Sequence, residues 1–512
     1  MLHAIIVKIF GVFIMSASEI SLKTEPNKTK KWTVVILLIP IIISFFQLRD
    51  LDNDFYFLYA TGEYIVKHGF PFTDMLSMHS SMKIVVQQWL SSVIFYYVYS
   101  FLGRYGIITL LYLCNIAICL LLYSLIKLIT GKPVLAAAIT AVIDFLLFDA
   151  YMVTRPQMFT YVVLLAEVYF LEKHVKTKKV NTLFAIPVLS LLLINLHAAM
   201  WAMLLVFMLP YLVSAVAFDA KTLKVEAQGN LFALLITMAV SVMAGLLNPY
   251  SFDNMLYLTS SYGQKSLSLI KEMYPTSLSS MEGMTFFGLF GITILIVCFI
   301  KKRLVARRFF LLYAGTLLLG MLQIKGIPYF YLFGVPAFAF MLKDIDFAKL
   351  KKPLKNYNTK SVRTLGCIFL SLCLVYLCEA RFFMTRDIIQ SNQEHIDRLE
   401  EVATILDQVE EPIVLYANFN DGQYFEFRGY HPYIDGRAEL FLAQNNKQYD
   451  YFAEYENLIS GKIYYQNFVN KYNFNYYVLC NGPDSYLLIA LLHDDDFEIV
   501  YVSEEVILMK KA

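Results

Sequence analysis

Repeated apolar runs, each about long enough to cross a lipid bilayer, constrain this chain more than any other feature of its sequence. A helix needs about 20 residues to cross a hydrocarbon layer of roughly 30 Å. Eleven runs approach that length, at 32–48, 105–126, 133–149, 158–172, 181–197, 200–217, 230–247, 284–300, 309–325, 328–342 and 362–380. One soluble core has too little interior to bury so many apolar helices. The sequence therefore predicts an α-helical polytopic membrane protein with about 11–13 membrane helices.

Two further runs are interrupted by polar residues. The run 88–103 is mixed with Ser and Tyr, and we expect it to lie partly in the membrane interface instead of crossing. The run 2–18 contains Lys8 in its middle, whereas a signal peptide carries its charge before the apolar stretch. Eleven crossings follow if neither run spans the bilayer.

The composition supports a membrane protein and narrows its partners. Hydrophobic residues make up 58% of the chain and charged residues only 16%, against roughly a quarter in soluble domains. The net charge of +2 gives no indication of a nucleic-acid partner. Most of the seven cysteines lie inside apolar runs, so they predict neither a disulfide framework nor a zinc cluster.

Lysine and arginine clusters predict the orientation. The clusters lie at 28–31, 173–179, 301–308 and 343–355. Basic loops stay in the cytoplasm, so we expect the loops 49–87 and 248–283 and the chain after 381 on the opposite side.

The chain divides by composition into three parts. Residues 1–31 form a cytoplasmic or interfacial segment, 32–380 the transmembrane domain, and 386–512 an extracytoplasmic domain. A helix-like stretch at 392–408 and β-type runs at Ile413–Tyr416 and Tyr476–Cys480 predict that this last part is a soluble α/β domain.

An acidic run opens the first outside loop, 49–87. Asp50, Asp52 and Asp54 follow directly after an apolar run. The Asp52-x-Asp54 spacing lets two carboxylates converge on one divalent cation, and a single carboxylate can deprotonate a hydroxyl. The aromatic helix that follows, 55–65, suits a sugar or a lipid headgroup. The alternatives are an ordinary acidic loop end and an aromatic membrane anchor, and spacing alone does not decide between them.

Two cations and a histidine border apolar segments. Arg155 and Lys325 stand where an isolated charge costs about 2.5–3.5 kcal/mol at mid-bilayer, which makes them candidates for binding a phosphate. Snorkelling is the alternative for Arg155, and a helix-end anchor for Lys325. His197 fits a polar lid near the outer face, or a structural role.

Short motifs in a fixed order resemble a known family. They are Asp52-Asn53-Asp54-Phe55-Tyr56 with Thr61-Gly62, Phe72-Thr73-Asp74, Gln88-Trp89-Leu90, Arg155-Pro156-Gln157, Asn195-Leu196-His197, Asn248-Pro249, Glu272 with Pro275, Lys325-Gly326-Ile327-Pro328 and Asp435-Gly436-Arg437. Together they resemble bacterial polytopic glycosyltransferase-like proteins of the GT-C superfamily.

The resemblance implies transfer of a sugar from a polyprenyl-phosphate carrier to a glycan, lipid or protein acceptor, on the outer face of the bacterial cytoplasmic membrane. It implies Asp54 as catalytic base, with Asp52 as a metal ligand or electrostatic partner. Mg²⁺ or Mn²⁺ is the candidate cofactor of these two carboxylates. The donor phosphate would meet Arg155 and Lys325, and the remaining donor or acceptor contacts would be Tyr56, Gln88, Trp89, His197 and Glu272.

Three positions depart from the family pattern. Leu58 replaces a usual His, Gln88 a Glu, and Lys325 an Arg, which leaves metal dependence and catalysis open. A transporter or flippase for lipid-linked glycans and a non-catalytic scaffold are the alternatives, although the sequence shows none of the inverted repeats typical of transporters.

Two tail motifs contain turn residues. Asn420-Asp421-Gly422 and Asp435-Gly436-Arg437 predict tight turns or hairpins. We also expect exposed aromatic residues around Tyr449, Tyr451, Phe452 and Tyr455, where a glycan acceptor would bind.

Overall fold

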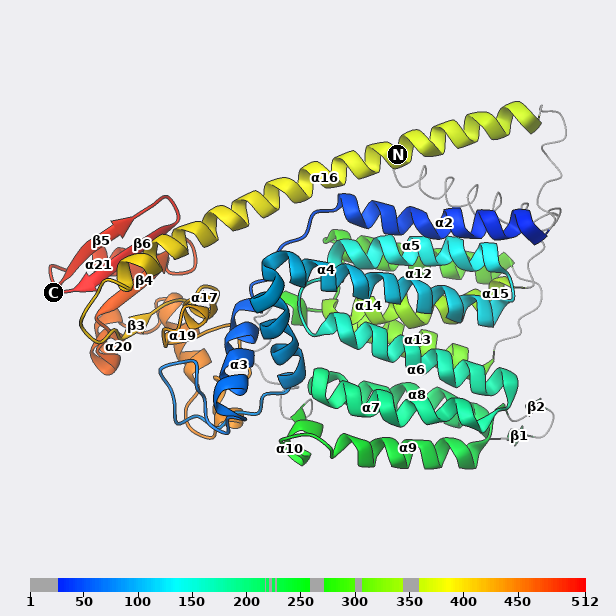
Figure 1. The fold of residues 1–512 in the computed structure, drawn as a ribbon, viewed down its shortest axis with the longest axis horizontal. Helices are drawn as coiled ribbons and strands as arrows, with labels where there is room; N and C mark the ends of the chain where they lie inside the picture. The colour runs from blue at the N-terminus through cyan, green and yellow to red at the C-terminus, as the bar shows by residue number, and fades with distance from the viewer. Residues whose placement is uncertain are drawn as a thin grey trace.

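The computed structural model describes residues 26–216, 218–220, 223–225, 228–257, 271–299, 306–343 and 359–512. A bundle of roughly parallel helices makes up most of the molecule, and the C-terminal domain lies beyond one end of it (Figure 1). The run 2–18 and parts of the basic clusters lie outside the described residues.

Every one of the eleven predicted runs coincides with a helical segment. These are α2 (Pro26–Phe46), α4 (Trp89–Thr130), α5 (Pro133–Tyr151), α6 (Gln157–Thr177), α7 (Ala185–Leu196), α8 (Trp201–Ala215), α9 (Leu231–Gly245), α12 (Met281–Phe299), α13 (Arg307–Leu322), the continuous run of α14 (Ile327–Tyr329), η6 (Phe330–Gly334) and α15 (Val335–Leu342), and α16 (Thr359–Leu406). Within the described chain, three segments have both the length and the apolarity to cross a membrane: Trp89–Thr130, Ala198–Ala215 and Ile324–Leu342. Five shorter apolar helices lie among them. The predicted fold class is confirmed, and the number of crossings stays a prediction.

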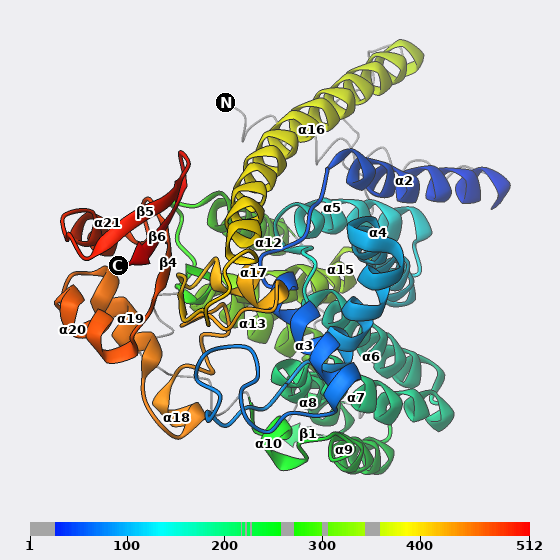
Figure 2. The same cartoon turned by 60° about the vertical axis from the view of Figure 1, so that its left-hand side comes forward.

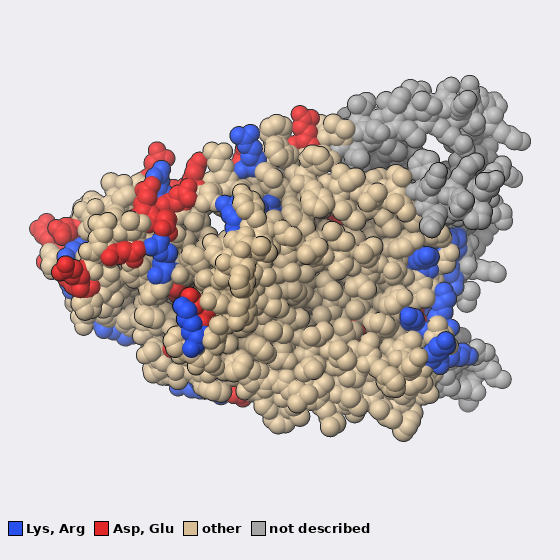
Figure 3. Space-filling model, viewed as in Figure 1, with Lys and Arg blue, Asp and Glu red and all other residues tan. Residues whose placement is uncertain are grey.

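Charged side chains are distributed as a membrane requires. On the face shown in Figure 3, a broad band over the bundle carries very few of them, and Lys and Arg gather at the end away from the C-terminal domain. Large apolar side chains such as Leu120, Phe232 and Leu295 are exposed on the helices of this band. Lipid is the natural solvent for such a surface.

The loop 49–87 forms a short helical layer at one end of the bundle. Helix α3 (Phe55–His68) packs against the first half of α4, and α4 breaks at Gly103, where φ is +61°. The stretch 88–103 is therefore a separate helical arm, set crosswise to the bundle (Figure 1). Gly62 permits this packing, because a Cβ there would lie 2.1 Å from the Ser92 carbonyl oxygen.

The C-terminal domain combines a four-stranded sheet with short helices. The strand order is β3 (Leu415–Tyr416), β4 (Tyr476–Cys480), β6 (Val506–Lys511) and β5 (Phe497–Val502), with only the β3–β4 pair parallel. The helices are α17 (Gly422–Phe427), α18 (Ala443–Asn446), α19 (Tyr451–Ile459), α20 (Tyr465–Tyr472) and α21 (Ser485–Leu492). Helix α16 runs unbroken from the bundle side into this domain, so the predicted boundary at 380–386 falls inside a helix.

One expectation about this domain is wrong. Phe452 and Tyr455 are not exposed for a glycan but buried, because α19 packs its apolar face against α21 and Phe419. Tyr449 remains exposed and stacks edge-on against Tyr451.

Candidate active site at the end of the bundle

Carboxylates and cations from distant parts of the chain meet at the end of the bundle beside the C-terminal domain. Asp52 and Asp54 lie in the loop that leads into α3, and Asp54 is the N-cap of that helix. Arg155 lies in the turn between α5 and α6. Glu272 belongs to the short helix η4 (Lys271–Met273), which packs against η5 (Ile324–Gly326), the helix that carries Lys325.

The Arg155 guanidinium contacts three carboxylates. Its Nε donates to Asp52 Oδ1 at 2.5 Å, and its Nη1 lies 3.1 Å from Asp54 Oδ2 and 3.4 Å from Glu272 Oε1. The Arg155 side chain is only 22% exposed. It therefore points into this cluster and does not snorkel toward solvent, which was the alternative reading of its position.

Backbone hydrogen bonds fix the loop that carries the two aspartates. The Asp52 N–H donates to Thr154 Oγ1 at 2.7 Å, beside Arg155. The Asp54 N–H donates to Asp52 Oδ1 at 3.1 Å. Both carboxylates are thus tied to the same turn as their cationic partner.

The electrostatic environment makes Asp54 a group that titrates near neutrality. Burial raises the pKa of Asp54 to about 7; Arg155 opposes this rise, and the negative charges of Asp52, Glu272 and Glu439 add to it. A carboxylate with such a pKa is suited to act as a general base at neutral pH.

Glu439 is a site residue that the sequence analysis missed. It lies within electrostatic range of both Asp54 and Lys325, and Lys325 also lies in range of Glu272. The only available signal was its position two residues after Asp435-Gly436-Arg437. With Glu439 included, four carboxylates each contact Arg155 or lie within electrostatic range of Lys325.

His197 lies near Lys325. It is almost fully buried, its Nδ1 shares a hydrogen bond of 2.8 Å with Thr160 Oγ1, and it lies within electrostatic range of Lys325. The structure thus brings His197 to the edge of the cluster.

Three other predicted residues make contacts elsewhere. The Tyr56 ring packs edge-on against Tyr424 of α17, with centroids 5.1 Å apart. Trp89 Nε1 donates to Asn195 Oδ1 at 2.8 Å. Gln88 caps α4, and its carbonyl oxygen accepts from the Ser92 N–H. These contacts join the helices around the site.

A second buried ion cluster links the loop 49–87 to the C-terminal domain. The Arg437 guanidinium lies 2.6 Å from Asp74 Oδ1, 2.6 Å from Asp435 Oδ2 and 3.0 Å from Glu426 Oε1. All three carboxylates are fully buried. The motif Asp435-Gly436-Arg437 keeps a local turn hydrogen bond, from the Arg437 N–H to Asp435 Oδ1, but it is not a surface hairpin.

This turn also comes close to the first cluster. A Cβ on Gly436 would lie 2.4 Å from Gln423 Oε1 and 3.4 Å from Asp54 Oδ1. Helix α17 packs against α3, as the two views of the fold show (Figures 1 and 2). The C-terminal domain therefore covers the loop that carries Asp52 and Asp54.

Comparisons with known proteins give a fold but no close relative. No family model and no curated protein sequence matches the chain. The oligosaccharyltransferase of Archaeoglobus fulgidus, tethered with an acceptor peptide, matches with a TM-score of 0.58 and 12% identity over 89% of this chain and 70% of that one. The same enzyme in complex with Zn and sulfate matches with a TM-score of 0.51 and 12% identity, over 88% and 68%.

ArnT from Cupriavidus metallidurans, bound to undecaprenyl phosphate, matches with a TM-score of 0.46 and 10% identity over 95% of this chain and 98% of that one. A likeness of that degree carries no argument for this chain. The two oligosaccharyltransferase matches support a GT-C glycosyltransferase-like fold, as the order of motifs predicts.

Proposed function

Starting from this GT-C-like fold, we propose that the chain is a membrane glycosyltransferase that moves a sugar from a polyprenyl-phosphate carrier to an acceptor outside the cytoplasmic membrane. The observation that carries the proposal is the meeting of Asp52, Asp54 and Arg155 at one end of an apolar bundle, under a soluble domain. A lipid-linked sugar enters such a site from the bilayer, and an acceptor reaches it from the aqueous side.

Asp54 is the proposed base. It takes the proton of the acceptor hydroxyl while that oxygen attacks the anomeric carbon, and the lipid phosphate leaves with the bonding electrons. Asp52 holds Arg155 through the shortest contact of the cluster, 2.5 Å. Its role is to orient the guanidinium beside the base.

The leaving phosphate needs cationic partners. The contact between Arg155 and Glu272 is the longest of the three, at 3.4 Å, and the Glu272 side chain is 57% exposed. Glu272 is therefore the carboxylate that a phosphate displaces most easily from Arg155. Lys325 lies within range of the same Glu272 and supplies the second positive charge.

The donor set also fits the predicted cation. Asp52 and Asp54 offer only carboxylate oxygens, which Mg²⁺ and Mn²⁺ prefer, and these two side chains would hold such an ion. A bound cation would neutralise charge on the leaving phosphate.

The test is transfer by the purified full-length protein. It is incubated with a panel of polyprenyl-phosphate sugars and glycan, lipid and peptide acceptors, and release of the lipid phosphate is measured. Asp54→Asn should lower that rate by at least about a thousandfold, in line with loss of a general base together with charge in the site.

Glu63→Gln is the matched control, because Glu63 is an acidic residue of the same helix α3 that pairs with Lys67 at the exposed surface. It should retain the wild-type rate. Equal rates for Asp54→Asn and the wild type, at equal membrane level and folding, would contradict the proposal and favour a transporter or a scaffold.

A further inference from the structure

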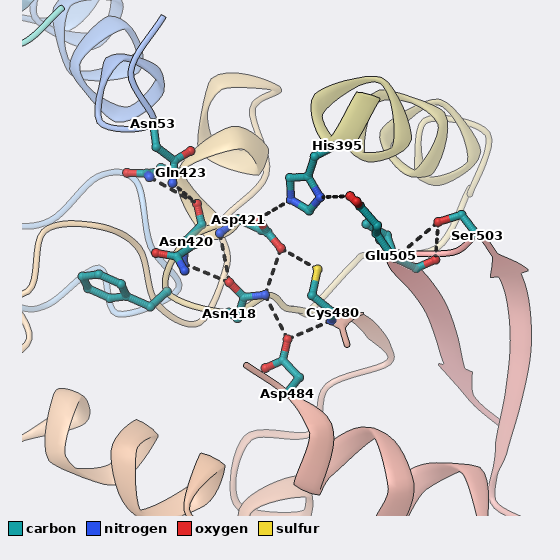
Figure 4. Close-up of polar contacts among 12 residues, drawn as sticks. Asn53, His395, Asn418, Asn420, Asp421, Gln423, Cys480, Asp484, Ser503 and Glu505 are labelled. Carbon is teal, nitrogen blue, oxygen red and sulfur yellow. Dashed lines mark hydrogen bonds and ion pairs between the residues drawn. The ribbon is translucent and has the colours of Figure 1, made fainter. Parts of the chain in front are cut away.

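Three side chains with metal-binding atoms meet where α16 enters the C-terminal domain, away from the carboxylate cluster. They are His395 of α16, Asp421 before α17 and Cys480 at the end of β4 (Figure 4). Their ligand atoms all lie within 4.8 Å of one another. In the part of the chain that the structure describes, this is the one group of three or more His, Cys, Asp or Glu side chains so arranged.

The His395 ring and the Cys480 thiol both point at the Asp421 carboxylate. His395 Nε2 lies 2.9 Å from Asp421 Oδ1, and Cys480 Sγ lies 2.8 Å from Asp421 Oδ2. Ligand atoms around a tetrahedral Zn²⁺ lie roughly 3.3–3.7 Å apart, given bond lengths of about 2.0–2.3 Å. Each pair would have to separate by less than about 1 Å to admit the ion. Asp421 and Cys480 are buried, whereas His395 is 28% exposed and borders solvent.

A set of outer hydrogen bonds holds these groups in place. Glu505 Oε2 lies 3.0 Å from His395 Nδ1, which leaves Nε2 directed at Asp421. A metal-binding histidine generally donates a hydrogen bond from its other ring N–H to a carboxylate in this way. Asn418 Nδ2 donates to Asp421 Oδ2 and to Asp484 Oδ2, both at 2.9 Å. The Cys480 N–H donates to Asp484 Oδ2, also at 2.9 Å.

The charges around the centre favour a dication. Asp421 and Asp484 are both buried, and Glu505 adds a third carboxylate. Among the described residues, His395 is the one basic side chain that pairs with Asp421 or Glu505. Buried carboxylates are stabilised by a paired cation or a coordinated metal.

We propose that His395, Asp421 and Cys480 bind one Zn²⁺, with solvent as the fourth ligand. A thiolate with an imidazole and a carboxylate is a zinc donor set, whereas Mg²⁺ and Ca²⁺ take oxygen ligands. Cys480 binds as the thiolate and His395 through a deprotonated Nε2, and the protons of both groups are released to solvent when the ion enters. No zinc pattern is visible in the sequence, because each ligand comes from a different element and only one of them is a cysteine.

Zinc at this position would affect the positions of Asp52 and Asp54 through one short loop. The Asn420 carbonyl, next to Asp421, accepts from Asn53 Nδ2 at 2.7 Å and from Gln423 Nε2 at 3.1 Å (Figure 4). Asn53 stands between Asp52 and Asp54. The ion would therefore fix the loop that positions the two aspartates, a consequence that rests on the proposed function.

Metal content of the full-length protein tests the site without any assay of transfer. The protein is purified in detergent without chelator, dialysed against metal-free buffer and analysed for zinc by mass spectrometry. We expect about one zinc per chain. Cys480→Ser and His395→Gln should each lower this value at least about tenfold, and Glu505→Gln should weaken zinc binding by about 10–100-fold.

Cys378→Ser is the matched control, since Cys378 is a partly exposed cysteine on the same helix α16. It should keep the wild-type zinc content. Because a buried substitution can also impair folding, a second measurement uses Co²⁺ in place of zinc: the wild type should show a thiolate-to-cobalt absorption band that Cys480→Ser lacks.

A wild-type protein without zinc and without that band would overturn the site, and the three groups would then form a hydrogen-bonded ion pair only. Zinc retained by Cys480→Ser would overturn the ligand set. If zinc binds but its removal leaves sugar transfer unchanged, the positioning role is wrong. If the protein shows no transferase activity, the zinc measurement still tests the metal site by itself.

Discussion

At the scale of single residues, Arg155 organises the candidate site. One guanidinium serves Asp52, Asp54 and Glu272, so the protonation of the proposed base depends on a charge that it shares with two other acids. The pH dependence of the rate of sugar transfer should therefore report this shared charge directly.

The first prediction concerns pH. Asp54 acts in its deprotonated form and burial raises its pKa to about 7, so kcat/KM should be low at pH 5 and rise about tenfold per unit, levelling off above about pH 7. The profile is measured over pH 5–9 with a lipid-linked donor. A plateau that extends unchanged to pH 5 would show that a different group is the base.

The second prediction removes the shared cation. Arg155→Gln leaves Asp54 with acidic neighbours and without its opposing charge, so the rising limb of the profile should move upward by about 1–3 pH units. Arg155→Lys retains the charge and should move the limb less. An unmoved limb in Arg155→Gln would mean that the ion pair does not exist in solution.

Residue types alone indicated several of these positions. Arg155 and Lys325 were recognisable because a cation beside an apolar run is costly, and Asp52 and Asp54 because of their spacing. Glu439 carried no such signal, since a glutamate in a polar domain is ordinary. The pair of Asp74 and Arg437 was equally hidden, because 363 residues separate the two partners.

At the scale of elements, apolar runs predict the helices. The packing of those helices depends also on glycines, at positions where a neighbouring element lies too close to admit a side chain. Gly62 lets α3 approach α4 closely, and Gly436 leaves room for the Gln423 side chain of α17. A motif in one sequence shows that a glycine is present; the element it accommodates becomes known only from the fold.

The third prediction tests the contact between α3 and α4. Gly62→Ala places a Cβ 2.1 Å from the Ser92 carbonyl oxygen, and this overpacking should destabilise the fold by about 1–3 kcal/mol. The measurement is the thermal unfolding midpoint in detergent. Gly315→Ala in α13 is the control, because an added Cβ there meets no atom within 4 Å. Equal midpoints for the two variants would rule out the close approach.

The fourth prediction tests the joint between the outside loop and the C-terminal domain. Arg437→Met leaves Asp74, Asp435 and Glu426 buried without their cation, which should cost about 3–5 kcal/mol. Limited proteolysis should then release the C-terminal domain faster. Arg398→Met, which removes an exposed arginine paired with Glu401, should leave the proteolysis rate unchanged.

At the scale of the whole molecule, the predicted architecture of an apolar bundle with a soluble α/β domain is confirmed. Hydropathy reports such large-scale features well, because lipid and water sort whole segments. It does not report how separate segments meet, so the packing of Tyr56 against Tyr424 of α17 could not be predicted, and its predicted substrate contact stays a prediction.

The fifth prediction concerns orientation. If the basic end of the bundle is cytoplasmic, a cysteine at exposed Asp495 should react with a membrane-impermeant maleimide on intact cells. A cysteine at exposed Lys179, after α6, should react only once the cells are opened. The reverse labelling pattern would place the C-terminal domain in the cytoplasm.

Helix α16 has a mechanical consequence. At 48 residues it is about 70 Å long, and it has no break between its membrane-side start and the residue that contacts Asp421. Such a rod acts as a lever arm: a change in its tilt of a few degrees displaces its far end by several ångströms. If α16 crosses the membrane as predicted, bilayer thickness would set that tilt and so tune how tightly the C-terminal domain closes over the aspartates.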